Sequence, residues 1–122
     1  MEFSSPRILL VEDDPAQATL FAQVLRMSGY TVVTADTAEE AVELLAASPF
    51  DLLLADWDLP EAMQGDALIA LAKQQYPTIK AILYSNHADV DVIAAACGAD
   101  AWLRKYEGIL KLRTLISTVL GK

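Results

Sequence analysis

Acidic side chains follow two short apolar runs of the sequence, and this pattern favours a site for a hard metal ion. Glu12 and Asp13 come directly after residues 8–11, and Asp56 comes directly after residues 52–55. Carboxylates held close together repel one another unless a cation compensates them. Oxygen ligands without His or Cys select a hard ion, and a small carboxylate set completed by water and phosphate oxygens suits Mg²⁺ better than Ca²⁺. We therefore expect Mg²⁺ beside these carboxylates.

A cation at this place would make phosphoryl chemistry possible. It would neutralise the oxygens of a phosphoryl group while a carboxylate attacks the phosphorus. A hydroxyl and an ammonium group can hold the remaining phosphoryl oxygens. Ser85 and Lys105 follow two further apolar runs and carry these two kinds of group.

Five short apolar runs are typical of strands, and the runs that are apolar on consecutive residues suit strands buried on both faces of a sheet. The segments between them carry apolar residues at helical spacing, such as Leu20, Val24 and Leu25, and we expect these stripes to be core. This alternation predicts an α/β fold with a doubly wound, five-stranded parallel sheet and helices on both faces. The expected strands are residues 8–11, 31–34, 52–55, 81–84 and 101–103, of which 31–34 is polar enough for an edge.

Local signals place several helix ends. Asp14-Pro15 is typical of a helix start with Pro at the first helical position, and Ser28-Gly29 of its end. Thr37, with Glu40 three residues later, fits a capping box. The third and fourth helices are expected at about residues 66–75 and 88–97.

Composition bounds the class of protein. A chain of 122 residues has the size of a single domain, which we expect to span residues 1–122. No apolar stretch approaches the roughly 20 residues of a membrane-spanning helix, and the start lacks the pattern of a signal peptide, so we expect a cytoplasmic protein without membrane insertion. The net charge of -8 argues against direct nucleic acid binding. Cys97 is the only cysteine, excludes an internal disulfide and is expected to be a small buried residue.

Together, the motifs and their order resemble those of response-regulator receiver domains of two-component signalling systems, in particular single-domain, chemotaxis-regulator-like members. Residues 8–14 look like the acidic-pair strand of that family, residues 51–60 like its phosphoacceptor segment, and residues 98–105 like its fifth strand. The resemblance covers Arg7 to about Leu120. It implies a flavodoxin-like sheet with strand order 2-1-3-4-5.

The resemblance also implies roles for the acidic residues. Asp56 would accept the phosphoryl group, and Asp13 would bind Mg²⁺ directly with Glu12 behind it. Asp58 would supply a backbone carbonyl to the metal, and Asp14 would cap the following helix.

Further roles fall on residues after the fourth strand and at the end of the fifth. Ser85 occupies the position of the switch hydroxyl, and Lys105 that of the phosphate-binding cation. Trp102 stands at the aromatic switch position, although its apolar strand suits a core residue equally well. Asn86 and His87 follow the hydroxyl and would modulate access of water to the phosphoryl group.

Partners and activity also follow from the resemblance. The phosphodonor would be a histidine kinase or a histidine phosphotransfer protein, and an unknown downstream protein would read the changed surface. The family's usual face for this purpose combines the fourth helix, fifth strand and fifth helix. A signalling domain of this kind is not an enzyme beyond its own phosphorylation and dephosphorylation.

Three departures from the family pattern touch the site. Tyr106 stands where relatives usually have Pro, and we expect a trans peptide bond before it because a non-proline cis bond costs about 2.5–4 kcal/mol. The segment from Asp56 to Gly65 is one residue longer than usual. Asn86 is larger than the usual residue.

Other functions remain open at this point. A degenerate receiver would bind partners without being phosphorylated. The Asp56-x-Asp58 pair also resembles the catalytic pair of haloacid-dehalogenase-like phosphatases, which carry it on their first strand. A flavin or nucleotide module is disfavoured, because the segment after the first strand is acidic rather than glycine-rich.

Overall fold

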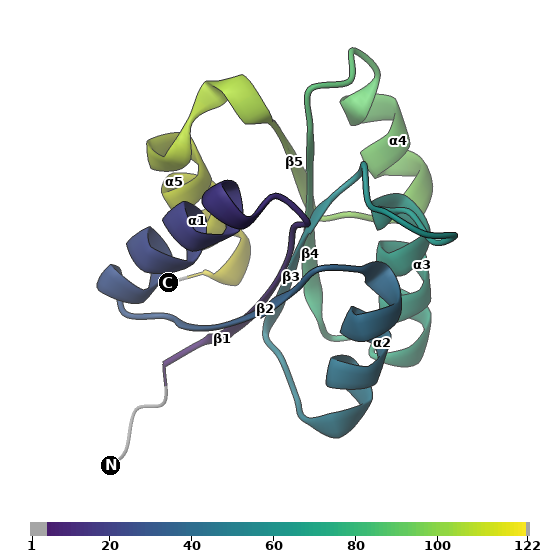
Figure 1. Ribbon diagram of the computed structural model, residues 1–122, viewed down its shortest axis with the longest axis horizontal. Coiled ribbons are helices and arrows are strands. Elements are labelled where there is room, and N and C mark those ends of the chain that lie inside the picture. Colours follow the sequence, from purple (N-terminus) through teal and green to yellow (C-terminus); the bar gives the residue numbers. More distant parts are fainter. Residues whose placement is uncertain (1–4, 122) are drawn as a thin grey trace.

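Strands and helices alternate along the chain in a computed structural model that describes residues 5–121. This alternation matches the predicted α/β class, and each strand extends one or two residues beyond its apolar run (Figure 1). The elements are β1 (Arg7–Val11), α1 (Pro15–Met27), β2 (Thr31–Ala35), α2 (Ala38–Ala47), β3 (Leu52–Asp56), α3 (Gly65–Gln75), β4 (Lys80–Ser85), α4 (Val90–Cys97), β5 (Ala101–Arg104), the 3-10 turn η1 (Lys105–Glu107) and α5 (Ile109–Leu120).

The five strands form one parallel sheet in the order β2-β1-β3-β4-β5, which confirms the predicted order. β2 lies at one edge, as the polar ends of its run indicate, and β5 lies at the other. β1 and β3 occupy the interior and are the strands whose ends carry the acidic residues. β2 is added on one side of β1 and the later strands on the other, so the order of addition reverses between β1 and β3. Ligands bind at such a switch point, outside the carboxyl ends of the strands.

Helices cover both faces of the sheet, as predicted. Figure 1 shows α1 and α5 together on one face and α2, α3 and α4 on the other. Successive strand residues point to opposite faces, so Ile8 and Leu10 join the core under α1 and α5, while Leu9 and Val11 join the core under α2 to α4. All four side chains are fully buried. Burial of each stabilises the fold by about 1.5–3 kcal/mol.

The predicted start and end of α1 are confirmed. Asp14 caps the helix by accepting a hydrogen bond from Ala16 N at 3.2 Å, and Pro15 is the first helical residue. Ser28 is its C-terminal cap, and Gly29 follows with a φ of 98°, a conformation that glycine adopts without steric cost.

The capping box before α2 forms only in part. Thr37 Oγ1 accepts the hydrogen bond from Glu40 N at 3.0 Å, as predicted. The Glu40 side chain, however, accepts its bond from Asp36 N at 2.8 Å rather than from the cap residue. The carboxylate therefore secures the residue before the cap, which follows directly after β2.

Two expectations about burial were wrong. Leu20 is 51% exposed, because the buried stripe of α1 runs through Phe21, Ala22 and Leu25 and leaves Leu20 at its flank. Cys97 is half-buried rather than buried, and its thiol donates to Ala94 O at 3.4 Å.

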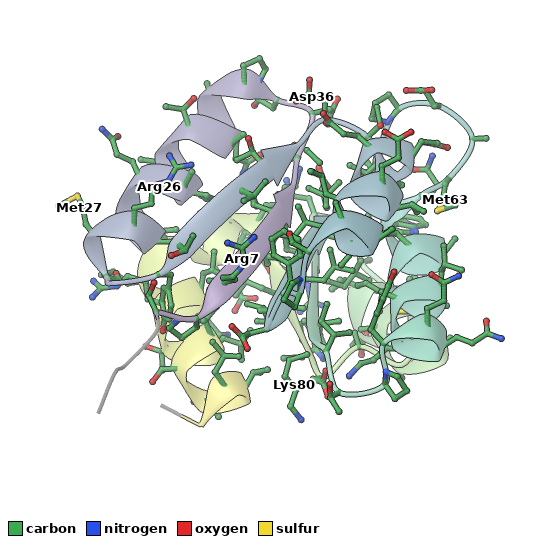
Figure 2. All side chains as sticks on the ribbon, turned by 90° about the horizontal axis from the view of Figure 1, so that it is seen from below. Arg7, Arg26, Met27, Asp36, Met63 and Lys80 are labelled. Carbon is green, nitrogen blue, oxygen red and sulfur yellow. The ribbon has the colours of Figure 1, made fainter. Side chains whose placement is uncertain are left out.

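Polar residues lie at both ends of the strands (Figure 2). Lys80 begins β4 at the amino edge of the sheet, whereas Asp36 follows β2 at the carboxyl edge. Residues 5–121 contain no cis peptide bond, so the predicted trans bond before Tyr106 is confirmed. Within the same residues, no helix is long and apolar enough to cross a membrane.

Candidate functional site

Strand register brings four polar side chains into a row at the carboxyl ends of the strands, here called the carboxyl edge. They are those of Glu12, Asp56, Tyr84 and Lys105. Asp56 and Tyr84 are direct partners in β3 and β4, and Tyr84 also pairs with Leu103 in β5. Glu12 lies one residue beyond the last β1–β3 pair, beside Asp56, and Lys105 lies two residues beyond Leu103. Paired residues project to the same face, so the row runs across four adjacent strands.

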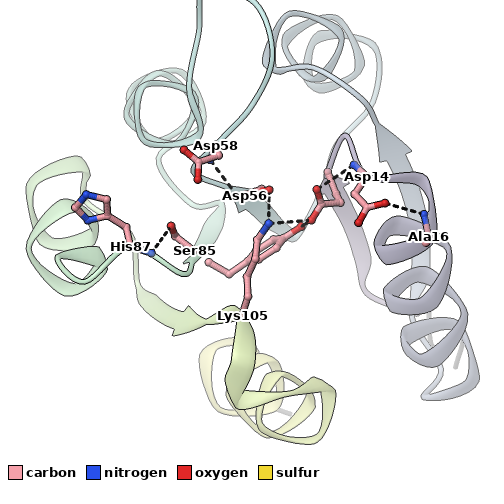
Figure 3. A network of polar contacts seen from close by, with 9 residues as sticks. Asp14, Ala16, Asp56, Asp58, Ser85, His87 and Lys105 are labelled. Atoms are coloured by element: carbon pink, nitrogen blue, oxygen red, sulfur yellow. Dashed lines mark hydrogen bonds and ion pairs between the residues drawn. The ribbon is translucent and has the colours of Figure 1, made fainter.

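Asp56 is the central residue of the row and is 1% exposed. Its Oδ2 accepts a hydrogen bond from Lys105 Nζ at 2.7 Å, and its Oδ1 accepts one from Asp58 N at 3.0 Å (Figure 3). Burial raises the pKa of Asp56 from 3.8 to about 7, because the charge of Glu12 adds to it and the bonds from Lys105 and Asp58 only partly oppose it. Without a further cation, Asp56 therefore holds its proton up to neutral pH.

Glu12 lies behind this carboxylate and is equally buried, at 1% exposure. Its Oε2 accepts a hydrogen bond from Asp14 N at 3.1 Å, and its Oε1 accepts one from the Tyr84 hydroxyl at 2.9 Å. Lys105 Nζ lies 3.6 Å from the same Oε1. Burial and the charge of Glu12 raise the pKa of Tyr84 well above its usual range, so the hydroxyl remains a donor.

Asp13 is the third carboxylate of the candidate metal centre. One ligand atom each from Glu12, Asp13 and Asp56 lie within 4.8 Å of one another, and Asp13 alone of the three is exposed. Glu12 already accepts protein hydrogen bonds on both oxygens, whereas Asp13 is open to solvent. The donor set consists of carboxylates without His or Cys, so its chemistry fits a hard divalent ion such as Mg²⁺.

Lys105 is the ammonium group that faces these carboxylates. Burial alone would lower the pKa of Lys105, but the hydrogen bond and charge of Asp56, with Glu12 beside it, raise the pKa overall. The ammonium also lies 5.4 Å from the centre of the Tyr84 ring. Lys105 therefore stays charged and is attached chiefly to Asp56.

Ser85 is fully buried at the end of β4. Its Oγ accepts a hydrogen bond from His87 N at 3.0 Å, and Figure 3 shows Ser85 and Lys105 entering the site from neighbouring segments. Asn86 and His87 are both exposed. The predicted hydroxyl thus lies at the strand end, and the residues expected to modulate it form the adjoining loop.

The two tryptophans lie outside the row of carboxylates. Trp57 is partly buried, and its ring meets that of His87 edge to face with centroids 4.6 Å apart. Trp102 is also partly buried, and the Arg104 guanidinium lies 4.8 Å from its ring centre. Trp102 packs against the core under α2 to α4, so it has both a core contact and an exposed part.

The loop between β3 and α3 is held by side chains that sequence reasoning did not single out. The Gln64 amide accepts a bond from Leu59 N at 3.0 Å and donates one to Leu59 O at 2.8 Å. Glu39 of α2 accepts a bond from Met63 N at 3.1 Å. These contacts hold the loop that follows Asp56. An amide residue directly before the helix glycine was the available signal.

Gly65 and Tyr84 were also missed. A Cβ at position 65 would lie 2.0 Å from the backbone oxygen of Asp56, so any side chain there would displace the end of β3. Tyr84 ended an apolar run and was assigned to the core with the rest of it. The signal was its hydroxyl, because a buried tyrosine needs a hydrogen-bond partner.

Comparison with known proteins agrees with this geometry. The model of the response regulator receiver domain family matches residues 8–117. Response regulator protein FleR of Pseudomonas aeruginosa is 30% identical over 119 residues, an alignment that covers 95% of this chain and 25% of FleR. Cell cycle transcriptional regulator CtrA of Caulobacter vibrioides is 37% identical over 100 residues, which cover 81% of this chain and 43% of CtrA.

A solved structure of another protein matches the fold over nearly the whole length of this chain. The crystal structure of a CheY-like response regulator receiver domain protein from Methanospirillum hungatei JF-1 has a TM-score of 0.90 and 33% identity. That alignment covers 97% of this chain and 95% of the other. The alignments cover less than half the length of FleR and of CtrA, so these comparisons concern only that part of each relative. The chain belongs to the response regulator receiver domain family of two-component systems.

Proposed function

We propose that Asp56 accepts a phosphoryl group with Mg²⁺ beside it and thereby switches a surface that partner proteins read. The observation that supports this most directly is the buried Asp56 carboxylate, 2.7 Å from Lys105 Nζ and grouped with Glu12 and Asp13. A nucleophile, a cation for phosphoryl oxygens and ligands for a metal ion thus occur within one small site.

The ligands for the ion would be the side chains of Asp13 and Asp56 and the backbone carbonyl of Asp58. Glu12 would act from behind, because both of its oxygens already accept protein hydrogen bonds. When bound, Mg²⁺ would neutralise phosphoryl oxygens and favour the ionised form of Asp56. Asp58 N, 3.0 Å from Asp56 Oδ1, keeps the carboxylate oriented.

The phosphodonor would be a phosphohistidine on a histidine kinase or a histidine phosphotransfer protein. An Asp56 oxygen forms a bond to phosphorus as the P–N bond of the donor breaks. The imidazole leaves with the electron pair and takes up a proton from solvent. Lys105, already beside Asp56, pairs with the phosphoryl oxygens and compensates their charge.

The switch would begin at Ser85, whose hydroxyl can donate to a phosphoryl oxygen. In the structure, Ser85 Oγ accepts a hydrogen bond from the His87 backbone N–H. A shift of Ser85 would therefore move the loop that carries Asn86 and His87. Trp102, on the adjacent strand β5, would report or transmit the change to the face formed by α4, β5 and α5. We propose that a downstream protein reads this face, and that the net charge of -8 keeps the domain from nucleic acid.

The test is phosphorylation by a small-molecule acyl phosphate, measured as intact protein mass with and without Mg²⁺. Wild type should gain one phosphoryl group only when Mg²⁺ is present, and Asp56→Asn should gain none. Asp51→Asn is the matched control, because Asp51 is a carboxylate directly before the first residue of β3, at the opposite end of the strand from Asp56. Equal labelling of wild type and Asp56→Asn would refute the proposal.

A further inference from the structure

Tyr84 is a buried residue whose polar atom points into the site. Its side chain is fully buried in β4 and its ring packs against Phe21, with centroids 5.7 Å apart. The three residues before it in the strand, Ala81, Ile82 and Leu83, are buried and wholly apolar. A phenylalanine would fill the same volume without the hydroxyl, which donates to Glu12 Oε1 at 2.9 Å.

The hydroxyl and the Lys105 ammonium compete for one carboxylate oxygen. Lys105 Nζ lies 3.6 Å from Glu12 Oε1 but only 2.7 Å from Asp56 Oδ2. Because Tyr84 already donates to Oε1, the ammonium finds its shorter contact at Asp56. Charge-assisted bonds to a carboxylate are strong, so an oxygen without its hydroxyl donor would attract the ammonium.

We propose that Tyr84 is a positioning residue, whose hydroxyl occupies Glu12 Oε1 and so directs the Lys105 ammonium to Asp56. This inference rests on the proposed phosphoacceptor function, which it deepens. In Tyr84→Phe the ammonium moves towards Glu12, and the phosphoryl group loses part of the positive charge that receives it. Tyr84 acts through Glu12 and Lys105 and does not touch the phosphoryl group itself.

The first experiment measures the position of Lys105 without any phosphodonor or Mg²⁺. NMR of the ¹⁵N-labelled lysine side chains, with the Lys105 signal assigned by its loss in Lys105→Arg, should show this signal shifted in Tyr84→Phe. Tyr76→Phe is the matched control, since it removes a phenolic hydroxyl near the amino edge of the sheet, and should leave the Lys105 signal unchanged.

The second experiment measures the rate of phosphorylation by an acyl phosphate at saturating Mg²⁺. Tyr84→Phe should slow the reaction about tenfold, the size of effect typical for residues that orient a metal or reaction site from behind. In a Glu12→Ala background the same substitution should change the rate less than twofold, because residues that act through one another are not additive. Tyr76→Phe should leave the rate unchanged.

A lower melting temperature of Tyr84→Phe with an unmoved Lys105 signal and an unchanged rate would overturn the inference and make Tyr84 a core residue only. A tenfold slower rate that persists in the Glu12→Ala background would overturn it as well. If wild type takes up no phosphoryl group, the proposed function fails, and the Lys105 signal alone then decides: a shift supports the positioning role and no shift refutes it.

Discussion

The carboxylates at the amino ends of the strands (the amino edge) and those at the carboxyl ends (the carboxyl edge) differ in how they are paired with donors. At the amino edge, carboxylates have their own donors. Asp51 accepts a hydrogen bond from Arg7 N at 2.7 Å. Asp100 lies 2.6 Å from Lys73 Nζ and accepts a second bond from Ala81 N at 2.8 Å. Each of these carboxylates ties a loop to a strand or helix.

At the carboxyl ends of the strands, two carboxylates share one ammonium and a third carboxylate lies beside them. Glu12 and Asp56 both lie near Lys105, and Asp13 joins them within the same cluster. Once Asp56 ionises, the arrangement leaves more buried negative charge than Lys105 balances, which costs stability unless a cation is added. The two carboxylates at the amino edge thus each have protein donors of their own, whereas the carboxylates of the candidate site share a donor and leave a place for a cation.

The largest effect should come from removing Asp13, the proposed ligand whose side chain is open to solvent. Asp13→Ala should weaken Mg²⁺ binding by about 100-fold or more, and Glu12→Ala by about tenfold, the effect of a residue behind a direct ligand. A Mg²⁺ titration followed by Trp57 fluorescence in a Trp102→Phe background measures both. Asp100→Asn, at the amino edge, should bind as the parent does. Equal effects of the Asp13 and Glu12 substitutions would mean that the direct ligand is wrongly assigned.

The next effect concerns stability, where the two edges should respond with opposite signs. Asp56→Asn should raise the free energy of unfolding without Mg²⁺ at pH 7.5 by roughly 2 kcal/mol, because it removes a buried charge in a repulsive cluster. Asp100→Asn should lower it by about 1 kcal/mol, the worth of a lost hydrogen-bonded pair. Urea unfolding of both variants measures the difference.

The pH dependence of the free energy of unfolding tests whether burial of the Asp56 charge causes the stability gain of Asp56→Asn. The pKa of Asp56 is about 7 in the folded chain against an ordinary 3.8, so the folded state binds the proton more tightly. Stability is therefore lost as pH rises from about 4 to about 7, and the advantage of Asp56→Asn should grow over the same range. An advantage of the same size at pH 4 and pH 7.5 would contradict the assigned role of burial.

A smaller effect is expected on the pH dependence of metal binding. Mg²⁺ must displace the proton of Asp56, so its affinity should rise by up to about tenfold per pH unit below pH 7 and level off above it. Calorimetric titration between pH 6 and pH 8 measures this slope. Asp56→Asn should bind more weakly and show a flatter profile, and a steep profile in that variant would assign the proton to another group.

The smallest effect concerns Asp58, which is exposed. Asp58→Asn should weaken Mg²⁺ binding by no more than roughly 1 kcal/mol, because a charge in contact with water acts at high dielectric. The same fluorescence titration should therefore place this variant between the parent and Asp13→Ala. An unchanged affinity would leave only the backbone carbonyl of Asp58 in the site.

Local patterns in the sequence allowed the strands and the end of the sheet that carries the site to be predicted, whereas the strand order was predicted from the resemblance to receiver domains. Short apolar runs mark buried strands, and residues after parallel strands must meet at one edge. Leu20 shows where such reasoning stops. Its helical spacing to Val24 was correct, but which side of the stripe faces the sheet depends on how α1 packs.

Contacts between distant residues could not be predicted in this way. The bond between Tyr84 and Glu12 joins residues 72 positions apart and depends on strand register. The two hydrogen bonds between the Gln64 amide and the Leu59 backbone depend on the path of the loop between β3 and α3. Apolar periodicity fixes which face a residue occupies but not the partner of its polar atoms.

The most direct test of the account is to locate the phosphoryl group at residue resolution. Wild type treated with an acyl phosphate and Mg²⁺ is digested, and the peptides are fragmented in a mass spectrometer with and without hydroxylamine, which cleaves acyl phosphates. The account predicts one hydroxylamine-sensitive group on Asp56, absent without Mg²⁺. A phosphoryl group on Ser85 or His87, or a label on Asp56 that forms equally well without Mg²⁺, would contradict it.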